Sequence, residues 1–163
     1  MNTRIGQAWS AINSLQKVWK APIKKETKTK VFKASVESIL LYGSDSWTLN
    51  VARTKKLDGS YTKMLRTVYN VSWRDHITNQ VLYGSLPRIS SVVKSRRLAL
   101  AGHVSRHDEP AGKLLLWSPT GKRRIGRPHI TIKKLLEKDT GLSGTDLLTA
   151  MRERGSWIKN FVH

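Results

Sequence analysis

The sequence predicts an all-α protein in two parts, a helical bundle over residues 1–84 and a smaller basic helical module over 85–163 with an extended Arg-rich loop. Two observations carry this prediction. Apolar residues recur at three- and four-residue steps, which places them on one face of a helix. Proline and glycine stand where these periodic stretches stop. With 163 residues, of which 39% are apolar, the chain is long enough to bury a core.

The first helix is predicted to end at Ala21, because the residue before Pro22 disfavours the helical region. Its apolar face consists of Ile5, Ala8, Trp9, Ile12, Leu15, Val18 and Trp19. A second helix is expected to begin near Thr27 and to reach Gly43, where the glycine either stops it or permits close packing. Its inward residues are Val31, Phe32, Val36, Ile39 and Leu40.

Three further helices are expected over 51–69, 77–83 and 91–106. The first of them should bury Leu57, Tyr61, Met64, Leu65 and Val68. The last has Ser90 or Ser91 as a candidate cap, and its candidate apolar contacts are Val92, Val93, Leu100 and Val104. Residues 107–128 carry glycine and proline throughout, interrupted by a candidate short strand at 114–117.

Two more helices are expected towards the C-terminus. The first ends near Gly141 and carries Ile132, Leu135 and Leu136. The second begins at Ser143, whose hydroxyl can accept the first amide hydrogens, and Asp146 stands in its first turn, where a carboxylate is favourable.

The chain carries a formal net charge of +19, from 30 Lys and Arg against 11 Asp and Glu. Six tryptophans argue that this charge lies on a folded body and not on a disordered tail. Nucleic acid is therefore the first partner to consider. A membrane-surface protein stays open from charge alone, although the basic clusters lie in expected loops and not on a long amphipathic helix. No apolar run approaches the roughly 20 residues of a membrane span and no secretory signal is evident, so we expect an intracellular protein of the nucleus or cytoplasm.

The densest positive charge lies between residues 88 and 127. It comprises Arg88, Lys94, Arg96, Arg97, Arg106, Lys113, Lys122, Arg123, Arg124 and Arg127, against Asp108 and Glu109. The planar fork of arginine suits phosphate, and a Gly126-Arg127-Pro128 step favours an extended backbone that can follow a phosphate chain. The plain alternative is a solvated surface.

A second cluster consists of lysines, with Glu26 the one acid among them. Its members are Lys17, Lys20, Lys24, Lys25, Lys28, Lys30 and Lys33. Lysine offers less geometric specificity than arginine, so this cluster indicates electrostatic attraction to a phosphate backbone. An ordinary solvent-exposed face explains it equally well.

The sequence gives little support for a catalytic site or a metal-binding site. Absence of cysteine excludes disulfides, thiol nucleophiles and thiolate metal sites. His103, close to Arg106, is a candidate phosphate contact or a histidine bonded within the fold, and a metal would need further ligands. There are no paired aspartates, no phosphate-binding GxxxxGK[ST] loop and no GxSxG elbow. We expect no catalysis by this chain alone, no metal, no cofactor and no small-molecule substrate.

The tryptophans have two possible roles, core packing and stacking on unpaired bases. Core packing is expected for Trp9, Trp19 and Trp157, whereas Trp47, Trp73 and Trp117 lie near turns and stay undecided.

Five motifs follow one another along about residues 4–162. They are Leu40-Leu41-Tyr42-Gly43-Ser44-Asp45-Ser46-Trp47, Leu57-Asp58-Gly59-Ser60-Tyr61-Thr62-Lys63-Met64-Leu65-Arg66, Arg96-Arg97-Leu98-Ala99-Leu100-Ala101-Gly102-His103, Gly121-Lys122-Arg123-Arg124-Ile125-Gly126-Arg127-Pro128 and Ala150-Met151-Arg152-Glu153-Arg154-Gly155-Ser156-Trp157. In this order they resemble the region downstream of the polymerase palm in reverse transcriptases of non-LTR (LINE-type) retrotransposons. The resemblance implies a thumb-like first bundle that grips the template–primer duplex, and a C-terminal extension that helps to hold element RNA or target DNA. The family's palm aspartates and upstream endonuclease have no counterpart here, so RNA-directed DNA synthesis requires another polypeptide segment.

The chain departs from the family pattern at a few positions. Ser44 and Ser60 stand where the family commonly has cysteine, Ile132 stands where many relatives carry an aromatic residue, and Glu153-Arg154 replaces a frequent Asp-Arg pair. The start at Met1, where the thumb begins in the family, suggests a fragment or a truncated copy.

We therefore expect a non-catalytic, nucleic-acid-binding fragment of such an RNA-directed DNA polymerase. Its expected phosphate contacts are Lys24, Lys25, Lys28, Arg96, Arg97, Arg106, Lys122, Arg123, Arg124 and Arg127. Its expected partners are RNA, an RNA–DNA hybrid or duplex DNA, and the remainder of the polymerase. Two alternatives stay open: a stand-alone helical protein-interaction module derived from such an element, and an enzyme with an unrecognised site.

Overall fold

The computed structural model describes residues 1–107, 110–115, 117, 126 and 130–162. All regular secondary structure within these ranges is helical, which confirms the predicted all-α class. The chain forms two compact units: unit 1 comprises Met1–Gly43 and Val51–Ser91, and unit 2 comprises Ser44–Asn50 and Val92–His163. Compactness does not show which segments fold alone, so the domains 1–84 and 85–163 stay a prediction.

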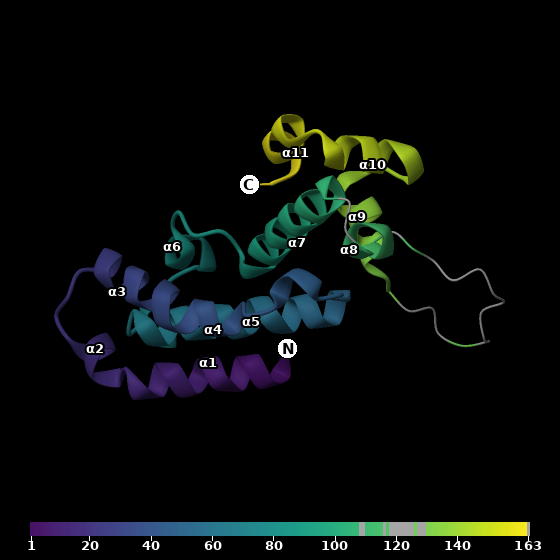
Figure 1. Cartoon of the computed structure of the whole chain (residues 1–163). Coiled ribbons are helices and arrows are strands. Elements are labelled where there is room, and N and C mark those ends of the chain that lie inside the picture. The colour runs from purple at the N-terminus through teal and green to yellow at the C-terminus, as the bar shows by residue number, and fades with distance from the viewer. Residues whose placement is uncertain (108–109, 116, 118–125, 127–129, 163) are drawn as a thin grey trace. The chain divides into compact units, whose positions relative to one another are not determined.

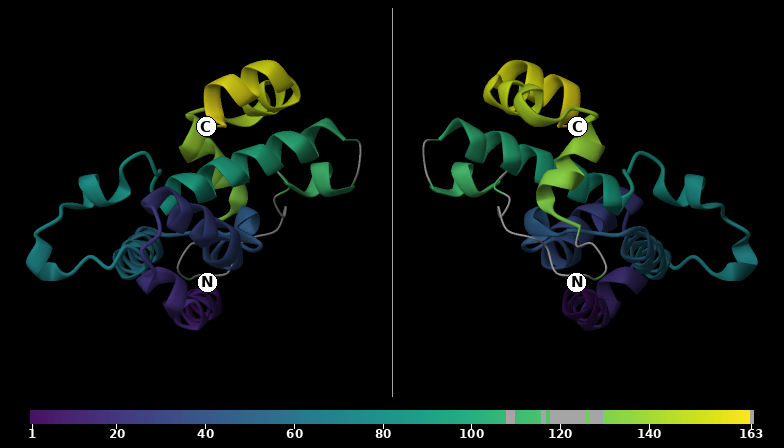
Figure 2. Two further views of the ribbon diagram at one scale, coloured as in Figure 1. Left: turned by 90° about the vertical axis from the view of Figure 1, so that its left-hand side faces the viewer. Right: turned by 90° about the vertical axis from the view of Figure 1, so that its right-hand side faces the viewer.

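Unit 1 contains three long helical stretches and a protruding segment. Its elements are α1 (Asn2–Ser14), α2 (Gln16–Lys20), α3 (Lys25–Phe32), the π-helical turn η1 (Lys33–Glu37), α4 (Ser38–Leu40), α5 (Val51–Val68), the 3-10 turn η3 (Trp73–Asp75) and α6 (Asn79–Tyr83). In Figure 1, α1 lies beside α4 and α5, and the turned views of Figure 2 look nearly along the axes of α1 and α5. Residues 69–88, which carry η3 and α6, project to one side of α5 (Figure 2).

The helix boundaries follow the expected breakers with two differences. The expected single first helix is divided at Leu15, whose backbone angles (φ −99°, ψ 16°) leave the helical range. The second stretch begins at Lys25, before the expected start at Thr27, and continues through α3, η1 and α4. Gly43 follows it with φ +67°, a conformation that glycine adopts at little cost, so the glycine stops this stretch.

The core of unit 1 is built on the expected apolar faces. All five residues predicted for 51–69 are buried: Leu57, Tyr61, Met64, Leu65 and Val68. From α1, the buried residues are Ile5, Ala8 and Ile12. Trp19 is 1% exposed and its indole Nε1–H donates to the Ile12 carbonyl oxygen at 2.9 Å, which confirms its core position. Trp9 is half-buried at the edge of this face.

The start of α7 (Ile89–Arg106) corrects the expected cap. Ser90 and Ser91 lie inside the helix, so neither is its N-cap. Instead, the Ser90 amide donates to Asp58 Oδ1 at 3.0 Å, and the Ser90 hydroxyl donates to Asp58 Oδ2 at 2.9 Å. A carboxylate from α5 thus satisfies a first-turn amide of α7, and local sequence alone does not reveal this long-range cap.

Unit 2 contains the 3-10 turn η2 (Ser44–Ser46), most of α7, α8 (Pro110–Leu115), α9 (Ile132–Thr140), α10 (Gly144–Arg152) and α11 (Arg154–Phe161). Its core consists of Leu98, Ala101, Leu136, Leu147, Met151 and Trp157. Leu100, an expected apolar contact, is 37% exposed, because the buried face of α7 runs through Leu98 and Ala101. Trp157 is 1% exposed, as expected.

Two local predictions in unit 2 were wrong. Leu114 and Leu115 belong to α8 and not to a strand, and α8 starts at Pro110, whose fixed φ suits a first helical position. Ser143 is the N-cap of α10, but its side chain makes no capping hydrogen bond. By contrast, α9 ends as expected at Gly141, which has φ +75°.

Candidate nucleic-acid interface

Exposed lysines occur on α2, on α3, at the start of η1 and on the connection between α2 and α3. Those exposed are Lys17, Lys20, Lys24, Lys25, Lys30 and Lys33, and we call this set the lysine face. Lys17 and Lys20 stand in the last turn of α2, where a positive charge also complements the helix dipole. Glu26 is the one acid between residues 17 and 33, so the face has a strong positive excess on a folded scaffold.

Lys25 is anchored as well as exposed. Its ammonium lies 4.8 Å from the centroid of the Tyr69 ring and donates to the Leu82 carbonyl oxygen at 3.4 Å. The Tyr69 hydroxyl is in turn 2.8 Å from Thr29 Oγ1. These contacts hold the Lys25 side chain against unit 1 and so lower the entropy that it loses when it binds a phosphate.

Lys28 does not fit the predicted phosphate contact. The residue is 9% exposed, and its ammonium donates to the carbonyl oxygen of Trp19 at the end of α2. The same oxygen accepts from Asn70 Nδ2 at 2.7 Å. A buried ammonium is costly unless it is hydrogen-bonded, and this contact supplies the bond, so Lys28 stabilises the junction of α2 and α3.

Arg97 is likewise buried and does not fit its predicted role. Its side chain is 7% exposed and forms an ion pair with Asp139, while Nη1 donates to the Trp47 carbonyl oxygen at 3.2 Å. These two contacts tie α9 and the segment 44–50 to α7 within unit 2. Its neighbour Arg96 is exposed on the same helix and is compatible with the predicted contact.

Arg106 has a mixed position at the end of α7. It is half-buried, and its Nη1 donates to the Met151 carbonyl oxygen at 3.0 Å, close to the end of α10. Together with Ser105, His107 and Arg152 it lines an open depression of about 500 Å³. Helix carbonyls at this end favour cations, so part of the Arg106 charge serves the fold.

Four predicted contacts in the Arg-rich loop, Lys122, Arg123, Arg124 and Arg127, lie outside the described residues. They stay a prediction from the sequence. Thus the structure brings Lys24 and Lys25 together on the lysine face and leaves Arg96 exposed, whereas it uses Lys28 and Arg97 inside the units.

Two tryptophans that the sequence left undecided are exposed. Trp73 is 76% exposed, and the guanidinium of Arg74 lies 5.5 Å from its ring centroid. A capping box formed by Ser72 and Asp75 holds the turn η3 that carries it. The Ser-x-x-Asp spacing of this box is a sequence signal that could have located the turn. Trp117 is 64% exposed.

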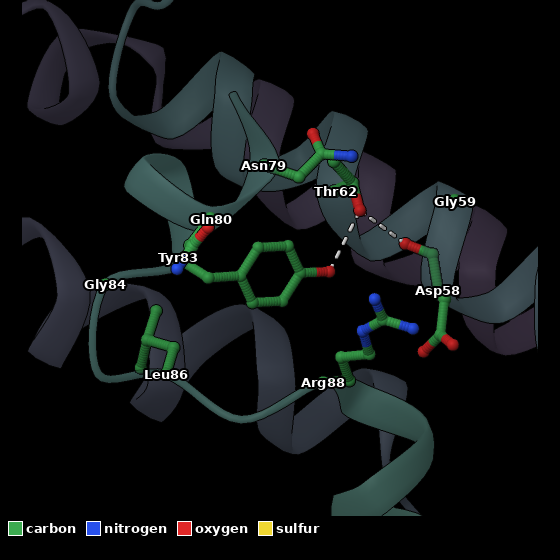
Figure 3. Close-up of a pocket in the computed structure, with 9 residues that line it drawn as sticks. All are labelled: Asp58, Gly59, Thr62, Asn79, Gln80, Tyr83, Gly84, Leu86 and Arg88. Carbon is green, nitrogen blue, oxygen red and sulfur yellow. Dashed lines mark hydrogen bonds between the residues drawn. The ribbon is translucent and has the colours of Figure 1, made fainter. Parts of the chain in front are cut away.

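Sequence reasoning did not reveal a pocket in unit 1. It has a volume of about 570 Å³ and lies between α5, α6 and the segment that follows α6 (Figure 3). Its lining residues are Asp58, Gly59, Thr62, Asn79, Gln80, Tyr83, Gly84, Leu86 and Arg88. No local sequence motif predicts this pocket, because its walls come from two separate stretches of the chain.

Among the described residues, no three His, Cys, Asp or Glu side chains are grouped so that they could hold a metal ion. His103 on α7 and His107 just after its end form a pair, with ring centroids 4.6 Å apart. No helix in the described ranges has the length and apolarity needed to cross a bilayer.

Comparison with known proteins finds a distant relationship to a transposon-derived protein. The chain is 24% identical, over 166 aligned positions, to the transposon-derived protein F52C9.6 of Caenorhabditis elegans. The alignment covers 93% of this chain and 60% of the nematode protein, so the chain spans less than two thirds of that relative. The sequence matches no protein-family profile, and no solved structure is significantly similar.

Proposed function

We propose that this chain is a transposon-derived, non-catalytic nucleic-acid-binding module, and more specifically the thumb-like bundle and basic C-terminal region of a non-LTR retrotransposon reverse transcriptase. The observation that carries the proposal is the lysine face, six exposed lysines between residues 17 and 33, a stretch in which Glu26 is the one acid. The ordered motifs and the likeness to a transposon-derived nematode protein support the origin.

In this proposal, the lysine face lies along the phosphates of a template–primer duplex. Each ammonium that approaches a phosphate releases a condensed counterion, and this release is the main source of affinity for a sequence-independent contact. Arg96 and the loop residues Lys122, Arg123, Arg124 and Arg127 extend the contacts to element RNA or target DNA. Contacts of this kind position a nucleic acid without reading its sequence. Polymer synthesis belongs to the rest of the enzyme, which supplies the palm aspartates.

Fluorescence anisotropy of the full chain tests the proposal, with an RNA–DNA hybrid, duplex DNA and single-stranded RNA at several salt concentrations. We expect binding that persists near physiological salt and favours the hybrid or structured RNA. The triple variant Lys20→Gln/Lys24→Gln/Lys30→Gln should lower the salt slope by up to about three, since each lost phosphate contact contributes about 0.9.

A matched control is available on α5 of the same unit. Lys55→Gln/Lys56→Gln/Lys63→Gln removes the same charge from exposed positions outside the lysine face. An equal loss of slope in both triple variants would mean that only total charge matters. Weak binding to all three nucleic acids, collapsing equally with salt, would favour the protein-interaction alternative, whose signature is a stable oligomer.

A further inference from the structure

One wall of the unit 1 pocket in Figure 3 is held by hydrogen bonds and ring packing. The Thr62 hydroxyl donates its single proton to the Asp58 carbonyl oxygen at 2.8 Å. In the contact between Thr62 Oγ1 and the Tyr83 hydroxyl, at 2.9 Å, Tyr83 is therefore the donor. The Tyr83 ring also packs against Tyr61, with centroids 6.0 Å apart. The aromatic side of the pocket is thus held by both a hydrogen bond and ring packing.

Other lining residues of the pocket offer groups that recognise planar polar ligands. Arg88 directs its guanidinium into the space between Tyr83 and Asp58, and the side-chain amides of Asn79 and Gln80 line the pocket near α6 (Figure 3). The Asn79 amide is oriented by Arg66, whose Nη2 donates to Asn79 Oδ1 at 3.1 Å. Arginine, asparagine and glutamine are the side chains that form paired hydrogen bonds with the edges of nucleobases.

The charge of the lining indicates that the pocket suits the base of a nucleotide and not its phosphate. The Asp58 carboxylate accepts two hydrogen bonds from Ser90 and carries one negative charge, and Arg88 carries the one positive charge of the lining. The formal charges of the lining cancel, so a phosphate group gains no net attraction here. A neutral heteroaromatic base can still stack and form hydrogen bonds in such a site, because neither interaction requires a net charge.

Space for a ring comes from two glycines in the wall. A Cβ atom added at Gly59 or Gly84 would have no other atom within 4 Å, so the space next to each glycine is open. Gly59 lies inside α5, where glycine is unfavourable compared with alanine, and no close contact requires a glycine there. A volume of about 570 Å³ is within the usual range of small-ligand pockets.

We infer that this pocket receives one unpaired nucleobase of a bound strand, stacked near Tyr83 and hydrogen-bonded by Arg88 and the two amides. The inference rests on the proposed function, since the base belongs to a nucleic acid held by the lysine face. The proposed function includes contacts to phosphates only, and this inference adds a contact to a base.

The test compares two probes with the full-length chain. Both are RNA–DNA hybrids with a short unpaired RNA extension, and in the second probe the extension is abasic. The number of phosphates is equal, so their affinity ratio reports the bases alone. We expect the extension with bases to bind about tenfold tighter, in keeping with the usual value of stacking on an aromatic side chain.

Variants then test whether this difference in affinity between the two probes comes from the pocket. Gly59→Leu projects a side chain into the pocket and Arg88→Gln removes the guanidinium, and each should reduce the ratio to near one. The matched controls Gly59→Ala and Lys55→Gln should keep it, since the first adds no bulk beyond Cβ and the second removes a charge outside the pocket. Thermal unfolding of Gly59→Leu should show no loss of stability, because leucine is the better helix former.

The outcomes are separable. A ratio near one in the unchanged chain, with good binding of the abasic probe, would overturn the nucleobase site and leave the proposed function standing. A tenfold ratio that survives Gly59→Leu would place the base elsewhere, for example on the exposed Trp73, and would also overturn the inference. Failure to bind either probe would reject the proposed function and the inference with it.

Discussion

Trp157 occupies the space that a side chain at Gly102 would need. The indole Nε1–H of Trp157 donates to the Leu98 carbonyl oxygen at 2.8 Å, and a Cβ atom at residue 102 would lie 2.5 Å from ring atoms of Trp157. The tryptophan is 1% exposed and cannot retreat without losing the core of unit 2. Glycine at this position in α7 therefore has a packing reason, which its modest helix propensity alone does not give.

Gly102→Ala is expected to destabilise unit 2 by about 1–3 kcal/mol, since the added methyl overfills a close-packed site. Urea unfolding followed by tryptophan fluorescence measures this change. Gly59→Ala serves as the control, because its Cβ meets no atom within 4 Å and alanine favours the helix by about 0.5–1 kcal/mol. Equal stability of the two variants would contradict the close contact with Trp157.

Arg96 and Arg97 are neighbours in sequence with opposite expected roles. Arg97→Gln leaves Asp139 without its buried ion-pair partner and should lower the free energy of unfolding by about 3–5 kcal/mol. Arg96→Gln should change stability by less than about 0.5 kcal/mol, as exposed substitutions usually do, and weaken nucleic-acid binding. Chemical denaturation and anisotropy on both variants check the contrast. A larger loss of stability in Arg96→Gln would reverse the assignment.

The Tyr61 hydroxyl donates to Glu37 Oε2 at 2.7 Å inside unit 1. Burial raises the pKa of this hydroxyl far above its ordinary value of 10.0, and the Glu37 carboxylate adds to the effect. The unfolded chain releases the proton near pH 10 while the folded chain keeps it, so the free energy of unfolding falls as the pH rises above about 10, by up to about 1.4 kcal/mol per pH unit.

Tyr61→Phe reduces this loss of stability at alkaline pH. The variant should be less stable by about 1 kcal/mol at neutral pH, since it lacks the hydrogen bond to Glu37. Between about pH 10 and pH 12 its stability should fall less steeply than that of the unchanged chain, so the difference narrows or reverses. Parallel pH curves, measured by chemical denaturation, would mean that Tyr61 ionises equally well in both states.

The Arg-rich loop gives a prediction that rests on sequence alone. Arg123→Gln/Arg124→Gln/Arg127→Gln should weaken binding to every nucleic acid alike and lower the salt slope by as much as about three. Anisotropy titrations over a series of salt concentrations measure the slope. An unchanged slope would remove this loop from the interface, whatever the fate of the lysine face.

Local patterns predicted the helices well where one chemical signal dominated. The buried face of α5, the stop before Gly43 and the end of α9 at Gly141 follow from periodicity and from the freedom of glycine at positive φ. The expected strand at 114–117 was wrong because a short apolar run fits a helix as well as a strand, and Pro110 favours the helix start. The N-terminal cap of α7 was missed because its carboxylate comes from residue 58.

One part of the candidate site could be predicted from the sequence, and another part could not. The lysine cluster was visible in the sequence, and the structure leaves six of its seven members exposed. The pocket beside α5 was not visible, because its lining joins residues 58–62 to residues 79–88 and includes no motif. Neither the volume between two segments nor the direction of Arg88 can be read from spacing along the chain.

What the sequence determined by itself is the all-α class, most helix ends and the strong positive charge, since these depend on residue type and on neighbours within a few positions. Tertiary structure alone decided which cations face solvent. Lys28 is one turn from exposed Lys24, yet it bonds the carbonyl of Trp19, and Arg97 adjoins exposed Arg96, yet it pairs with Asp139. A cation can be buried only where the fold places a carbonyl or carboxylate oxygen from another segment beside it, because a charge is stable inside a protein only when it is hydrogen-bonded or paired there.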